Sequence, residues 1–142
     1  MSLIHPQTEA ALLEAGRLSR QLGSRYRHAI EHLLDRGETL DVFNARAEAL
    51  DQQAGKLDDL IRSRDLLPRD ANTELNDLHR IADQLSGWMD ADQARSLASR
   101  FAEEEQSLLD ELETAARDEA LASSLDPMLE ACRKIIDDLR DP

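Results

Sequence analysis

Two histidines one helical turn apart are the first residues whose spacing suggests chemistry. His28 and His32 would present their imidazoles on one helical face, where together they can share Zn²⁺ or Ni²⁺. Two ligands do not complete a metal site, and the neighbouring apolar stripe places both rings at its margin. The alternative interpretation is a half-exposed helix flank that binds no metal.

A carboxylate also stands where the surrounding pattern requires an apolar residue. Glu105 interrupts a stripe formed by Ala94, Ala98, Phe101, Leu108, Leu112 and Ala115. An ionised carboxylate among apolar groups requires a cation or hydrogen-bond donors, and Arg25, Tyr26 and His79 on other predicted helices are candidate partners. The alternatives are a polar contact that fixes helix register, or a helix rotated so that Glu105 lies at the edge of the core.

The motifs of common enzymes are missing from the sequence. A carboxylate-bridged di-iron bundle takes Glu-x-x-His from two of its helices, and none of the four histidines has a glutamate three positions earlier. The chain also has no P-loop, nucleophile elbow or dinucleotide fingerprint. We therefore expect no enzymatic activity and no cofactor. The single cysteine, Cys132, falls at an apolar helical position and is expected to be a core residue.

Composition predicts the fold class that must position these residues. The 142 residues include 24 Leu and 19 Ala but only seven Val and Ile together, with 3% aromatic residues. Helix formers dominate and strand formers are scarce, so the sequence predicts one all-α domain spanning residues 1–142.

Apolar spacing of three and four residues predicts five helices. Gly37 is expected to end the first helix in a left-handed conformation, Thr39 to cap the second, Pro68 to end it, and Asp126-Pro127 to start the fifth. The predicted ranges are 7–36, 40–66, 73–89, 91–117 and 126–139. We predict an antiparallel four-helix bundle of two hairpins, with the shorter helix 73–89 as the crossover between them.

The net charge of −13 argues against nucleic acid and anionic membranes as partners. No apolar run approaches the length of a membrane span, and the first residues lack the pattern of a signal peptide. We expect a cytoplasmic protein whose partner is another protein or a second copy of itself. Whether it is a monomer or a homodimer stays open.

Several short motifs resemble one known family. They are Gly23-x-x-Tyr26-Arg27-x-x-x-Glu31, Val42-Phe43-x-x-Arg46-Ala47, Leu78-His79-Arg80, Trp88-Met89 and the glutamate at Glu105. Together they are similar to the proteobacterial ferritin-like four-helix-bundle family filed as domain of unknown function 2383. The resemblance implies a ferritin-like fold and singles out five residues, Tyr26, Glu31, His79, Arg80 and Glu105. The acidic run around Glu105 and the leucine at Leu112 depart from the family pattern.

Three functions follow from these features as hypotheses. The first is a non-catalytic binding or stress-related module without a standard di-iron centre. The second is an adaptor similar to export chaperones, which would bind a partner helix in an apolar groove. The third is a ferritin-like protein that holds a single metal, for which Glu31, His79 and Glu105 would have to converge.

Overall fold

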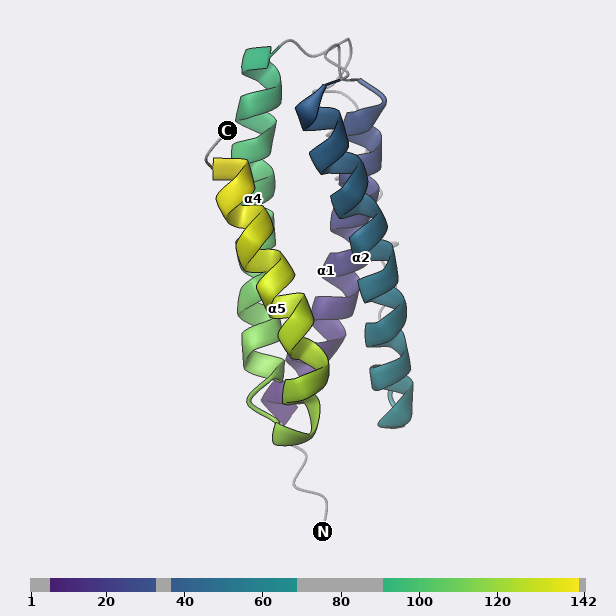
Figure 1. Ribbon diagram of the computed structural model, residues 1–142. Coiled ribbons are helices and arrows are strands. Elements are labelled where there is room, and N and C mark those ends of the chain that lie inside the picture. The colour runs from purple at the N-terminus through teal and green to yellow at the C-terminus, as the bar shows by residue number, and fades with distance from the viewer. Residues whose placement is uncertain (1–5, 33–36, 69–90, 141–142) are drawn as a thin grey trace.

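The chain forms a bundle of long helices in the computed structural model, which describes residues 6–32, 37–68 and 91–140 (Figure 1). The helices are α1 (Pro6–Ile30), α2 (Glu38–Ser63), α4 (Ala91–Ala115) and α5 (Glu119–Arg140). These described ranges contain no strand, which confirms the all-α prediction. The predicted crossover helix 73–89 lies outside the described residues.

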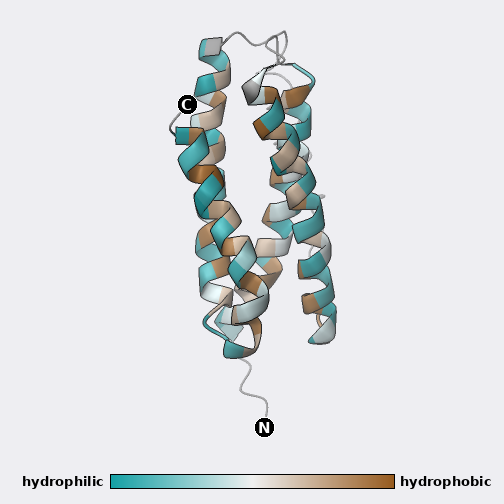
Figure 2. Ribbon diagram, viewed as in Figure 1, coloured by the Kyte–Doolittle hydropathy of each residue, from teal (hydrophilic) through white to brown (hydrophobic). Residues whose placement is uncertain are grey.

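The helices pack side by side along their length. α1 packs against both α2 and α4, and α4 packs against α5. In Figure 1, α1 rises from the end near the N-terminus and α2 descends beside it, whereas α4 descends and α5 rises. Figure 2 shows apolar and polar residues alternating around each helix, as expected for helices that bury one face.

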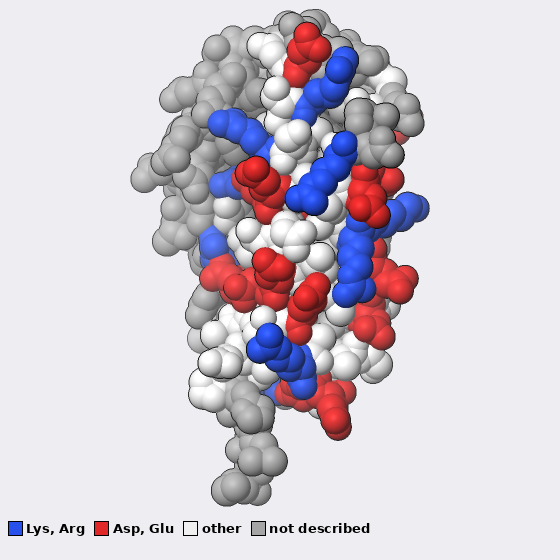
Figure 3. All heavy atoms as spheres, turned by 90° about the vertical axis from the view of Figure 1, so that its left-hand side faces the viewer, with Lys and Arg blue, Asp and Glu red and all other residues white. Residues whose placement is uncertain are grey.

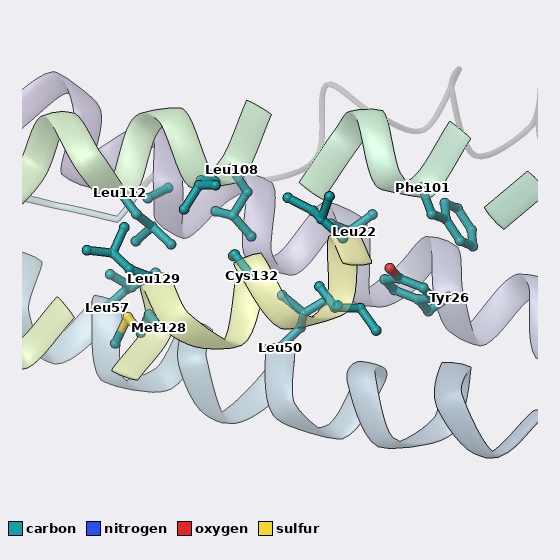
Figure 4. Close-up of a cluster of buried hydrophobic side chains, with 14 of the residues drawn as sticks. Leu22, Tyr26, Leu50, Leu57, Phe101, Leu108, Leu112, Met128, Leu129 and Cys132 are labelled. Atoms are coloured by element: carbon teal, nitrogen blue, oxygen red, sulfur yellow. The ribbon is translucent and has the colours of Figure 1, made fainter. Parts of the chain in front are cut away.

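The predicted stripes form most of the core. In the heptad of α2, Phe43, Leu50 and Leu57 are buried, and Figure 4 shows leucines of all four helices meeting in the interior. Leu18 and Ala98, also predicted as stripe residues, are only partly buried and pack at the edge of the cluster. A core of Leu and Ala lets the helices approach closely through many small contacts.

The connection between α1 and α2 differs from the prediction. α1 ends at Ile30 rather than near Arg36, and α2 already begins at Glu38. Gly37 is the N-cap of α2 with φ of −89°, so it is not a left-handed C-cap, and Thr39 lies inside the helix rather than capping it.

The end of α2 is set by a left-handed residue rather than by a proline. The helix stops at Ser63, and Asp65 has φ of 60°. The N–H of Leu66 then donates to the carbonyl of Ile61 at 3.2 Å, and the N–H of Asp65 donates to Arg62 at 3.0 Å. This is the hydrogen-bond pattern of a Schellman motif, so the prediction that Pro68 ends the helix was wrong.

The start of α5 was also predicted wrongly. α5 begins at Glu119, where the Asp118 carboxylate accepts a hydrogen bond from the N–H of Ala120 at 2.9 Å. Pro127, expected in the first turn, lies inside the helix. Proline removes one helical hydrogen bond, but both Pro127 and Ser123 one turn earlier are exposed, so water can satisfy the freed carbonyl.

One face of the molecule is charged and mixed in sign. On the face drawn in Figure 3, acidic and basic side chains are interspersed. None of the helices that the structure describes is both long and apolar enough to cross a lipid bilayer.

Candidate functional site

Each of the four helices contributes one polar side chain to a cluster in the bundle interior. These are Tyr26 of α1, Arg46 of α2, Glu105 of α4 and Cys132 of α5, which we call the polar cluster. Arg46 is 4% exposed and the other three residues are 0% exposed. The cluster therefore lies out of contact with solvent.

Glu105 is the acceptor on which the polar cluster converges. The Arg46 guanidinium donates from Nε to Oε2 and from Nη2 to Oε1, both at 2.7 Å, which is a bidentate ion pair. The Tyr26 hydroxyl donates to Oε2 at 2.8 Å. The Cys132 sulfur lies 3.3 Å from Nη2 of Arg46 and 3.9 Å from Oε1 of Glu105. Both carboxylate oxygens of Glu105 thus accept hydrogen bonds from neighbouring side chains.

The partners of Glu105 agree only partly with the sequence prediction. Glu105 faces inward, and Tyr26, one of its three candidate partners, contacts it. Arg25 instead pairs with Glu104, and His79 lies outside the described residues. The cation is Arg46, which sequence reasoning missed. The sequence feature that could have identified Arg46 is its position, three residues after Phe43 and directly before Ala47. Both of these residues belong to the apolar stripe, and a charged residue between them must be paired.

Three aromatic rings enclose one side of the polar cluster. Ring centroids lie 4.4 Å apart for Tyr26 and Phe101, 5.3 Å for Tyr26 and Phe43, and 5.5 Å for Phe43 and Phe101. Phe43 and Phe101 are each 1% exposed, so the Tyr26 ring that contacts Glu105 packs against buried apolar groups. In such an apolar setting each hydrogen bond is electrostatically stronger, and leaving any member unpaired would be correspondingly costly.

Burial and the charge of Glu105 together determine the protonation states of the groups around that carboxylate. Burial raises the pKa of Tyr26 far above its ordinary value of 10.0, and the negative charge of Glu105 raises it further. Burial likewise raises the pKa of the Cys132 thiol to about 12. Desolvation lowers the pKa of Arg46, but the hydrogen bonds and charge of Glu105 outweigh it, so that pKa is raised. At neutral pH the phenol and thiol are neutral and the guanidinium is charged.

This arrangement is poorly suited to metal binding or proton transfer. A metal approaching Glu105 would have to displace Arg46 or Tyr26, and the guanidinium charge would repel a divalent cation. Across residues 6–32, 37–68 and 91–140, no three His, Cys, Asp or Glu side chains are placed to hold a metal together. The polar cluster is instead arranged to hold four helices in one register.

None of the remaining candidates among residues 6–32, 37–68 and 91–140 belongs to the polar cluster. Glu31 is exposed beyond the end of α1, so the structure does not bring it to the buried Glu105. His28 and His32 are partly buried with ring centroids 5.1 Å apart, which agrees with their predicted place at a helix margin. Arg80, like His79, belongs to the part of the chain that is not described.

A second buried polar contact joins α1 to α2. The Gln53 side-chain amide donates to the Ser19 hydroxyl at 3.0 Å, and that hydroxyl donates to the carbonyl of Ala15 at 2.8 Å. Sequence reasoning did not single out this pair. The sequence feature that could have predicted this contact is a glutamine on the core face of α2, because a buried amide needs a hydrogen-bond partner on a neighbouring helix.

Comparison with known proteins yields no relative for this chain. No family model, curated protein or solved structure matches it. The family resemblance in the sequence therefore stays a prediction, and function has to be argued from the geometry.

Proposed function

We propose that this chain is a non-catalytic binding module on an antiparallel, ferritin-like bundle that lacks a di-iron centre. The observation that carries the proposal is that both carboxylate oxygens of Glu105 already accept hydrogen bonds from protein side chains. A di-iron bundle directs carboxylates inward so that they neutralise metal charge. Here the Arg46 guanidinium supplies the neutralising charge through two hydrogen bonds of 2.7 Å.

The course of the helices supports the ferritin-like part of the proposal. In Figure 1 the chain leaves α2 at one end of the bundle and enters α4 at the opposite end, so α2 and α4 both descend. Ferritin-like bundles have one long crossover connection, which produces this order of directions. The short motifs that resemble the family of unknown function 2383 point the same way.

A metal titration tests the absence of an interior centre. Wild-type protein and the variants Glu105→Gln and Glu103→Gln are titrated with Mn²⁺ and Fe²⁺ under anaerobic conditions in a calorimeter. Glu103 is exposed and serves as the matched control. We expect the three titrations to coincide. Stoichiometric binding that disappears only in Glu105→Gln would overturn the proposal.

The binding role is tested by competition in extract of the native cell. Protein captured on the immobilised chain should be displaced by excess untagged wild-type chain. Displacement should be equally effective with Glu105→Gln if that variant keeps its fold, because Glu105 is buried and cannot touch a partner. Capture that no competitor displaces would refute the binding role.

An adaptor that binds a partner helix is the second candidate, favoured by one feature of the packing. α1 packs with α2 and α4, and α4 packs with α5, but α2 and α5 are not among the closely packed pairs. A partner helix would have to enter between α2 and α5, because the apolar residues of α5 are buried in the bundle. Hydrogen exchange distinguishes the candidates: a closed bundle protects the amides of α5 as well as those of α1, whereas an adaptor shows faster exchange in α5.

A further inference from the structure

We propose that His28 and His32 form a two-imidazole site for a divalent transition metal, of which Zn²⁺ is the representative. The site lies at the C-terminal end of α1, on the margin of the bundle and separate from the polar cluster. It goes beyond the proposed function, which concerns the interior.

The distance between the two rings fits one shared metal. A Zn–N bond is about 2.0 to 2.1 Å, so a ring centroid lies about 3.2 Å from the bound metal. Two rings at the tetrahedral angle then have centroids about 5.2 Å apart. The observed separation of the His28 and His32 centroids is 5.1 Å. The centroid separation therefore permits a shared metal, once the His28 ring turns its buried Nε2 toward that metal.

The hydrogen bond of His32 leaves one ring nitrogen ready to bind. Nδ1 of His32 lies 3.0 Å from the carbonyl oxygen of His28. Because a carbonyl only accepts hydrogen bonds, Nδ1 carries the proton and Nε2 keeps its lone pair. Metal-binding histidines are oriented in the same way, with the other ring N–H donated to a carbonyl or carboxylate.

His28 supplies the second nitrogen. Its Nε2 is buried and has no hydrogen-bond partner among the residues that the structure describes. A buried nitrogen without a partner is energetically unfavourable, and an ion at that position is one of the arrangements that removes the penalty.

The local charge also favours a cation. The His pair lies at the C-terminal end of α1, where the helix dipole stabilises positive charge. Arg27, the nearest cation along the chain, forms an ion pair with Asp51, and the exposed Glu31 carboxylate follows the helix. Solvent would complete the coordination shell, because no set of three protein ligands exists among residues 6–32, 37–68 and 91–140.

Calorimetric titration with Zn²⁺ tests the site on full-length protein purified without an affinity tag. We expect one Zn²⁺ per chain, and at least about tenfold weaker binding in His28→Gln and in His32→Gln, since even loss of an outer-shell partner of a metal ligand weakens binding by that factor. The matched control is His5→Gln, which alters a histidine preceding the opposite end of α1 and should leave affinity unchanged. Circular dichroism confirms that each variant is folded.

Electron paramagnetic resonance with Cu²⁺, which binds such ligands more tightly than Zn²⁺, supplies a second measurement. Wild-type protein should show coupling to two imidazole nitrogens, and each single variant coupling to one. Zn²⁺ affinity that is unchanged in both His variants, or no Zn²⁺ uptake by wild-type protein, would overturn the site. Loss of binding only in Glu105→Gln would instead place a metal in the interior, contradicting both the proposed function and this inference.

Discussion

Removing one member of the Arg46–Glu105 ion pair is expected to destabilise the bundle strongly. Both side chains are almost fully buried, and the two hydrogen bonds between them are short. Loss of either residue leaves the other charge buried without its partner, which costs about 3 to 5 kcal/mol. We therefore expect Arg46→Met and Glu105→Leu each to lower the free energy of unfolding by that amount.

The double variant Arg46→Met/Glu105→Leu is expected to lose much less than the sum of the single losses. It replaces the ion pair with apolar side chains, so neither charge is left buried. The Tyr26 hydroxyl still loses its acceptor, which costs about 1 to 3 kcal/mol. Additive losses would total about 6 to 10 kcal/mol, comparable to the whole stability of a typical domain, so the two outcomes are easily separated.

Urea denaturation followed by circular dichroism measures all four proteins, because urea does not screen charge. The control is the Arg27–Asp51 pair, whose side chains are 51% and 50% exposed, and for which Arg27→Gln should cost no more than about 1 kcal/mol. Single losses no larger than this control, or a double loss equal to the sum of the singles, would refute the role assigned to the ion pair.

Three further predictions follow from burial. Tyr26 is the only tyrosine in the sequence, and its pKa is strongly raised. Phenolate absorbance should therefore appear above pH 10 only as the protein unfolds. A gradual titration of the phenol while the fold is intact would contradict the burial of Tyr26. The pKa of Cys132 rises from 9.0 to about 12, so the unfolded chain releases this proton first, and stability should fall between those pH values by up to about 1.4 kcal/mol per pH unit. Cys132→Ala should flatten that part of the measured stability curve; an unchanged slope would count against the shift. Leu50→Ala should lower the free energy of unfolding, measured by urea denaturation, by about 2 to 5 kcal/mol, because Leu50 is fully buried. A loss too small to measure would mean that the core around Leu50 fills the cavity or is open to solvent.

The periodicity of the sequence was enough to predict the four described helices and most of the faces that they bury. Leu50 and Leu57 lie in the core as the heptad of α2 predicts, because side-chain spacing alone decides which face of a helix is apolar. Helix ends were less predictable, since they depend on backbone conformation. Asp65 takes a left-handed φ that its residue type does not require, and Pro127 is tolerated inside α5 where its missing hydrogen bond faces water.

The composition of the polar cluster could be predicted only in part. Glu105 was recognisable because it breaks a stripe within its own helix. Arg46 was not, because its partner is 59 residues away in the chain and no local pattern pairs them. The predicted partner Arg25 is adjacent to Tyr26, but its side chain reaches Glu104 instead, a choice that depends on the rotation of α1 relative to α4.

A core of leucine and alanine explains why a buried ion pair is retained in this bundle. Such side chains pack almost equally well when one helix slides by a turn, so apolar contacts alone specify register weakly. The polar cluster takes one group from each of the four helices, so a shift of any one helix breaks the contacts that its own group makes. The interior polar groups are thereby used to fix the fold. The binding role that we propose would therefore use the outside of the bundle, where the His28–His32 pair lies at the margin of α1.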